Sequence, residues 1–129
     1  MAEPRLARYE HIVPAKTVIG SNVVNANYED LGKIEDLVLD ASAGRIAYAV
    51  LSFGGFLGMG DKYFAIPWNA FTFNSPESRV VLNVEKKLLE KAPGFNKKNW
   101  PNMADATWGT SIHKHYGLTP YWEEDHSAW

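Results

Sequence analysis

The stretch from Arg45 to Phe53 constrains the fold more than any other, because it has the pattern of a β-strand with two apolar faces. Side chains of a strand alternate between its faces. The two faces are Ile46, Tyr48 and Val50 on one side, and Ala47, Ala49, Leu51 and Phe53 on the other. A strand with one face in water alternates apolar and polar residues, so both faces of this strand must be covered. The second cover is the C-terminal segment, a second copy of the chain, or another protein.

The segments around this strand are short apolar runs separated by turn residues, which is typical of a small β-barrel or sandwich. We therefore predict a mainly β fold. Gly32 falls in one of the expected turns, where glycine is free to take a positive φ. The expected elements are extended segments at Thr17–Gly20 and Asn22–Asn25, a turn at Glu29–Gly32, strands at Lys33–Asp40, Lys62–Ile66, Thr72–Phe73 and Val80–Val84, and helical turns at Glu85–Lys91.

Composition excludes several classes of function. The 129 residues contain no cysteine, which rules out disulfide frameworks, thiolate metal sites and cysteine nucleophiles. The formal net charge of -2 lacks the positive excess on which phosphate affinity depends, so we expect no nucleic-acid partner. No apolar run reaches the roughly 18 residues of a membrane-spanning helix. The N-terminal residues do not resemble a secretory signal, so we expect a cytoplasmic protein.

The composition of the sequence changes near residue 92. Alternating β-branched residues precede this point, and Asn, Lys and Trp residues dominate after it. We therefore divide the chain into an N-terminal arm (1–15), a barrel domain (16–92) and an aromatic-rich C-terminal extension (93–129). In the extension, Asp105 is a candidate cap for a short helix that runs to Tyr116 and ends at Gly117. We expect this extension to pack on the barrel, with Trp108 and Trp122 against the Ile46, Tyr48 and Val50 face.

The order of these segments resembles the PRC-barrel family. The residues that carry the resemblance are Ile19–Val24, Leu31–Asp40, Gly44–Ser52, Gly54–Gly60 and Phe64–Trp68. The family includes the cytoplasmic domain of the photosynthetic reaction centre H subunit and the C-terminal half of a bacterial ribosome-maturation factor. The resemblance implies a small β-barrel of about six strands. It also implies a non-enzymatic docking or assembly role, without cofactor, for which the partner is unspecified.

A glycine-rich loop follows the longest strand and is the candidate partner-binding site. It is not a phosphate cradle, because no Lys-Ser/Thr pair follows it and it leads into a strand rather than a helix. One interpretation is a wide loop whose apolar residues fold back over the barrel end. The other leaves them exposed as an anchor for a protein or a membrane surface. The candidate binding residues are Gly54, Gly55, Phe56, Leu57, Gly58 and Met59.

The titratable residues give no positive signal for catalysis or metal binding. His113 and His115 lie about 200° apart on a helix and cannot chelate one ion, so we expect surface histidines. No serine falls in a nucleophile motif. We therefore predict a non-enzymatic protein-interaction module that forms a homodimer, with Ile46, Tyr48, Val50, Trp108 and Trp122 in self-association or in packing of the extension. The alternatives are a peripheral module on a membrane complex and a barrel that binds a small molecule.

Overall fold

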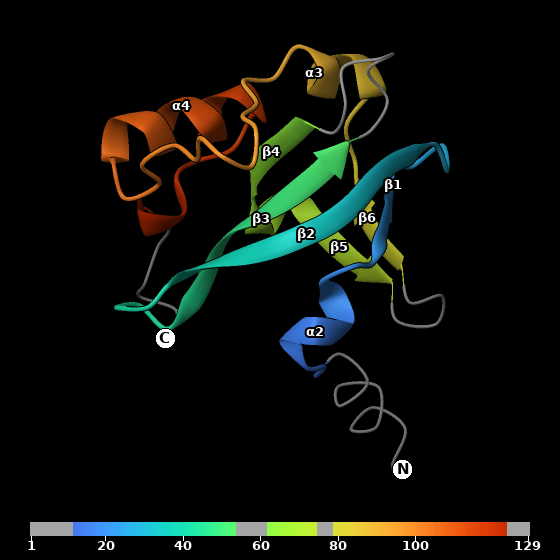
Figure 1. The fold of residues 1–129 in the computed structure, drawn as a ribbon, viewed down its shortest axis with the longest axis horizontal. Helices are drawn as coiled ribbons and strands as arrows, with labels where there is room; N and C mark the ends of the chain where they lie inside the picture. Colours follow the sequence, from blue (N-terminus) through green and yellow to red (C-terminus); the bar gives the residue numbers. More distant parts are fainter. Residues whose placement is uncertain (1–11, 54–61, 75–78, 124–129) are drawn as a thin grey trace.

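The computed structural model describes residues 12–53, 62–74 and 79–123. Six strands form one curled sheet, and short helices lie around it (Figure 1). The elements are α2 (Ala15–Val18), β1 (Asn22–Val24), β2 (Asp30–Asp40), β3 (Arg45–Phe53), β4 (Lys62–Pro67), η1 (Trp68–Ala70), β5 (Phe71–Asn74), β6 (Arg79–Leu82), α3 (Lys86–Glu90), α4 (Ala106–His115) and η3 (Tyr121–Glu123). The mainly β, small-barrel fold class predicted from the sequence is confirmed.

The sheet is mixed, with strand order β4-β3-β2-β1-β6-β5. Its neighbouring strands are antiparallel except β1 and β6, which pair in parallel at Val23↔Val80 and Val24↔Val81. The register of β2 against β3 shifts twice, between Ile34 and Asp36 and between Val38 and Leu39. Such bulges bend a strand and increase its twist. They account for the curl that lets β2 reach both β3 and β1.

The concave side of the sheet holds the main core. Ala49, Leu51 and Phe53 of β3 face it, as the alternation in the sequence predicts. The other members are buried side chains from every strand except β5, from α2 and α3, and from the second residue after α3: Val18, Val23, Leu31, Ile34, Phe64, Ile66, Val80, Leu82, Leu89 and Ala92. Ala47 was expected on this face and instead joins a second cluster with Tyr48. This difference arises because Ala47 is the extra residue of the bulge between the pairs Val38↔Tyr48 and Leu39↔Ile46, which breaks the alternation of β3 at this point.

Two local expectations near the N-terminal side are wrong. Thr17–Gly20 was expected to be extended, but Ala15–Val18 is a helical turn that places Val18 in the core. The amide of Thr17 donates to the carbonyl of Pro14, so a helical turn follows the proline. The turn expected at Glu29–Gly32 lies earlier, because the Asn25 side chain accepts bonds from the amides of Asn27 and Glu29.

Gly32 lies inside β2 rather than in a turn, and its φ is +123°. The positive φ agrees with the prediction for this glycine. A Cβ at this position would overlap the carbonyl oxygen of Ser52 on β3. Glycine is therefore required here twice, once for its backbone conformation and once for the close approach of β2 to β3.

Candidate functional site

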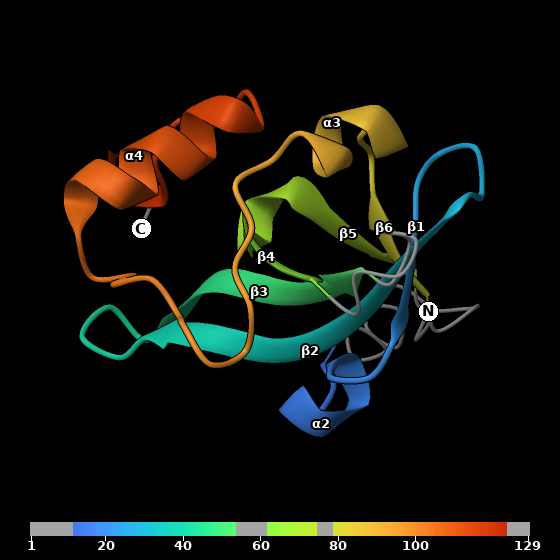
Figure 2. The ribbon, with the colours of Figure 1, turned by 45° about the horizontal axis from the view of Figure 1, so that its top comes forward.

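The outer face of β3 is covered by the C-terminal extension of the same chain. In Figure 2, α4 and the segment that precedes it lie over the β2–β3–β4 part of the sheet. Tyr48 is 2% exposed, and its ring meets that of Trp108 edge-on at a centroid distance of 5.2 Å. The ring of Tyr121 also meets it edge-on, at 6.2 Å. Val50 on the same strand is buried, whereas Ile46 is half-buried. A second copy of the chain is therefore not needed to shield Tyr48.

The helix that provides this cover begins and ends where the sequence predicts. The carboxylate of Asp105 accepts a hydrogen bond from the amide of Thr107, which satisfies one of the free donors at the N-terminus of α4. Gly117, with φ +71°, follows its last turn. Gly109 is buried in the middle of α4, where a Cβ would lie 2.7 Å from the hydroxyl oxygen of Tyr48. Glycine here lets the helix approach the sheet.

His113 is fully buried, so the expectation of a surface histidine is wrong for this residue. Its Nε2 accepts a hydrogen bond from the amide of Tyr121 at 3.3 Å, because an amide N–H can only donate. Its Nδ1–H therefore donates to the carbonyl of Gly109, at 2.7 Å. The sequence does not distinguish His113 from His115, which lies two residues away on the same helix and has a different role. His115 donates a hydrogen bond from Nε2 to the carbonyl of Leu88 on α3. His115 therefore joins the extension to α3, whereas His113 joins α4 to η3 within the extension.

A hydrogen bond joins the extension to the tip of the β2–β3 hairpin. The hydroxyl of Tyr121 donates to Oδ2 of Asp40 at 2.7 Å. The guanidinium carbon of Arg45, at the other side of the hairpin, lies 4.7 Å from the centre of the Tyr121 ring. The Tyr121 bond, with further bonds from the hairpin backbone, holds the pKa of Asp40 below its ordinary 3.8. Burial and the Asp40 bond raise the pKa of Tyr121 to about 12.

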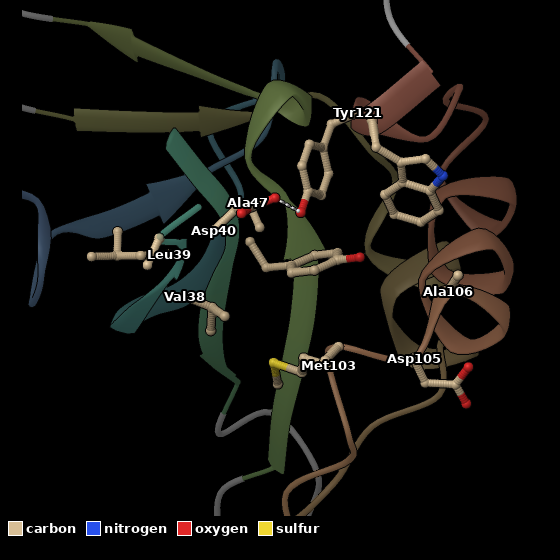
Figure 3. Close-up of a pocket in the computed structure, with 12 residues that line it drawn as sticks. Val38, Leu39, Asp40, Ala47, Met103, Asp105, Ala106 and Tyr121 are labelled. Carbon is tan, nitrogen blue, oxygen red and sulfur yellow. Dashed lines mark hydrogen bonds between the residues drawn. The ribbon is translucent and has the colours of Figure 1, made fainter. Parts of the chain in front are cut away.

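A pocket of about 560 Å³ lies between the hairpin and the extension (Figure 3). Figure 3 shows the bonded pair of Asp40 and Tyr121 at one side, and Met103 with Asp105 at the other. The side chain of Leu39 points away from this space. The lining residues are Val38, Leu39, Asp40, Ala41, Ala47, Tyr48, Met103, Ala104, Asp105, Ala106, Tyr121 and Trp122. We call this pocket the hairpin–extension groove.

Among the residues that the structure describes, the buried hydroxyl groups of Tyr48 and Tyr116 have no hydrogen-bond partner. Burial raises the pKa of Tyr48 to about 12 and raises the pKa of Tyr116 as well. Tyr48 lines the hairpin–extension groove, and its hydroxyl lies at the interface with α4. An unpaired buried hydroxyl costs free energy that a bound donor or acceptor would recover.

The structure describes some, but not all, of the residues expected to bind a partner or to pack the extension. The glycine loop, with Phe56, Leu57 and Met59, lies outside the described residues. Trp108 is half-buried against Tyr48, and Trp122 keeps 37% of its surface exposed beside the groove. Among residues 12–53, 62–74 and 79–123, no three His, Asp or Glu side chains gather as metal ligands. Within the same residues, no helix combines the length and the apolar character needed to cross a bilayer.

Sequence reasoning missed Asp40, Met103, Asp105 and Tyr121 as groove residues. They come from segments that are up to 81 positions apart, so no local pattern relates them. A usable signal is the aromatic density of the extension, which predicts packing of Trp108 and Trp122 on the barrel but does not single out Tyr121.

A curled six-stranded mixed sheet with a covering C-terminal extension defines a small β-barrel protein. The model of the PRC-barrel domain matches residues 10–89, more than half of the sequence, and the chain belongs to the PRC-barrel family. This confirms the resemblance found in the sequence.

Among solved structures, a 16S ribosomal RNA processing protein, RimM, from Pseudomonas aeruginosa matches at a TM-score of 0.40 and 14% identity. The match covers 58% of this chain and 45% of that chain, so it spans less than half of the larger protein. No curated protein matches the sequence at a significant level.

The Asp40–Tyr121 bond gives a prediction for the pH dependence of stability. A lowered carboxyl pKa stabilises the folded state above pH 3.8, and this contribution is lost as the pH falls through the folded-state value. A raised tyrosine pKa stabilises it below pH 10.0, and this contribution is lost as the pH rises toward about 12. The free-energy difference between wild type and Tyr121→Phe should therefore be largest between these limits and shrink at both ends.

Urea unfolding at acid, neutral and alkaline pH measures this difference. Ile12→Val is the control, because the Ile12 side chain is 69% exposed, carries no titratable group and lies outside the groove. Its difference from wild type should stay flat with pH. A Tyr121→Phe difference that is equally flat would contradict the bond.

Proposed function

We propose that this chain is a non-enzymatic module that binds another protein through the hairpin–extension groove. The observation that carries the proposal is this groove, which is lined mainly by aliphatic and aromatic side chains and bordered by the 37% exposed ring of Trp122. Aromatic residues in concave sites are the usual energetic centres of protein interfaces. The docking role implied by the family resemblance supports the same function. The proposal includes no cofactor and keeps the cytoplasmic location expected from the sequence.

The aromatic wall of the groove is already ordered. The Trp122 ring lies edge-on to the rings of Tyr121, at 5.2 Å, and of His113, at 5.5 Å. His113 is in turn held by its two hydrogen bonds. Binding of a partner here should cost little conformational entropy in these side chains, because they are already ordered before binding.

Site-specific photo-crosslinking in native cells tests the proposal. The photoreactive residue replaces Ala104, which is exposed and lines the groove, or Ile12, which is 69% exposed and lies before α2. We expect a discrete protein adduct from position 104 that position 12 does not give. The captured protein, once purified, should bind the wild type with 1:1 stoichiometry in calorimetry.

A variant in the groove separates specific from incidental capture. Met103→Asp places a charge among the apolar side chains of a half-buried position and should weaken binding of the purified partner at least about tenfold. Ile12→Asp is the matched control and should bind as the wild type does. Equal affinity of Met103→Asp and wild type would refute the groove as the binding site. Adducts with lipid alone at position 104 would favour the membrane alternative and overturn the proposal.

The homodimer expected from the sequence stays a prediction. The prediction is based on the apolar face around Tyr48, which needs a cover. In the structure, the extension of the same chain covers this face. Sedimentation velocity over a wide concentration range tests it directly.

A further inference from the structure

We propose that the segment which binds the hairpin–extension groove is basic, and that it places a lysine or arginine side chain beside an apolar one. This inference rests on the proposed function and names the chemistry of the partner. Two features of the groove carry it: the sign of the charges on its rim, and the aromatic surface between them.

The charges on the groove are negative. Asp40 and Asp105 are among its lining residues, which include no lysine or arginine, and the Asp105 carboxylate points outward at the rim, away from Asp40 (Figure 3). The Asp40 carboxylate accepts hydrogen bonds from the Tyr121 hydroxyl and the Ala43 amide, and the Asp105 carboxylate accepts one from the amide of Thr107. A carboxylate has about four acceptor positions, so these bonds leave capacity for donors of a ligand. Arg45 offsets part of the charge from outside the lining.

The negative charge continues beyond the pocket. Glu123, which is exposed, ends η3 directly after the lining residues Tyr121 and Trp122. A single carboxylate would be enough to balance the charge of one small organic cation. Acidic groups spread along a rim instead complement several positive charges on an extended chain, so the groove favours a peptide segment over a small organic cation.

The aromatic surface suits the same ligand. The exposed face of Trp122 offers a site for the stem of a lysine or for the plane of a guanidinium, which stacks on aromatic rings. The Tyr48 hydroxyl, which has no partner, lies in the same wall. A second copy of this chain fits less well, because its net charge of -2 would oppose the rim.

Peptide titrations followed by amide NMR shifts test the inference without the natural partner. The probes are three capped pentapeptides with a central tryptophan, flanked by two arginines, two glutamines or two glutamates. We expect the arginine peptide to shift the amide signals of Asp40 and of residues 103–106. The glutamine peptide should bind more weakly, at least about threefold, and the glutamate peptide more weakly still. Affinity for the arginine peptide should fall as salt is raised.

Two variants remove charge. Asp105→Asn keeps an equally good helix cap, whereas Asp40→Asn has one acceptor oxygen and keeps the bond from the Tyr121 hydroxyl or the bond from the Ala43 amide, but not both. Each should weaken the arginine peptide and leave the glutamine peptide unchanged. Glu29→Gln, exposed at the β1–β2 turn, is the charge control and should leave both unchanged.

The outcomes separate this inference from the proposed function. Equal binding of the arginine and glutamate peptides would overturn the basic partner, while a captured protein sensitive to Met103→Asp would leave the proposed function standing. Shifts confined to other parts of the chain would overturn the inference as well. Arginine amide that binds as tightly as the peptide would reassign the groove to a small cation and would also overturn it.

Discussion

Replacing Gly32 with alanine is expected to lower the free energy of unfolding by about 2–5 kcal/mol. One part, about 1–2 kcal/mol, comes from holding a residue with a Cβ at a positive φ. The other, about 1–3 kcal/mol, comes from the overlap between the new Cβ and the Ser52 carbonyl, which forces β2 away from β3. A small domain has a total stability of about 5–15 kcal/mol, so this single methyl group removes a large share. Urea denaturation monitored by circular dichroism measures the loss.

Gly44→Ala is the matched control, because Gly44 also has a positive φ, +68°, but no atom lies within 4 Å of the added Cβ. It should cost about 1–2 kcal/mol, the backbone contribution alone. If Gly32→Ala were no more destabilising than Gly44→Ala, the close approach of β2 to β3 would be refuted.

Replacing Tyr48 with alanine is expected to destabilise the protein by about 3–5 kcal/mol, the range for removing a buried aromatic side chain. The loss should be concentrated in the extension, because the Tyr48 ring contacts the rings of Trp108, His113 and Tyr121. Hydrogen exchange should therefore speed up in α4 far more than in β6, which belongs to the main core.

Tyr48→Phe separates the ring from its hydroxyl. The hydroxyl is buried without a partner, so its removal should change stability by less than about 1 kcal/mol or raise it. A loss in Tyr48→Phe as large as that in Tyr48→Ala would show that the hydroxyl, rather than the ring, holds the extension. Equal acceleration of exchange in α4 and β6 after Tyr48→Ala would contradict a separate outer cluster.

Those parts of the fold that depend on local patterns could be predicted from the sequence. The bounds of β3 follow from the nearly continuous apolar run between Gly44 and Gly54, and the structure has the strand at Arg45–Phe53. The bounds of α4 follow from Asp105 as a cap and Gly117 as a terminator, and both take those positions. Each signal lies within a few residues of the element it defines.

The groove could not be predicted, because it depends on contacts between distant segments. Asp40 meets Tyr121 only once the hairpin and the extension have both folded. The two bulges of the β2–β3 ladder are a second reason, since each extra residue, Glu35 in β2 and Ala47 in β3, reverses the alternation beyond it. Asp36, on the same side as Ile34 in a regular strand, is exposed while Ile34 is buried.

The parallel pairing of β1 with β6 has a consequence for the route by which the chain folds. β2, β3 and β4 pair with their sequence neighbours, so each ladder closes a short loop, whereas Val23 and Val80 come together across most of the barrel domain. Closing such a long loop costs conformational entropy before any contact rewards it. We therefore expect the antiparallel strands β2, β3 and β4 to pair early in folding. The parallel pairing of β1 with β6 should form later, and it completes the native topology.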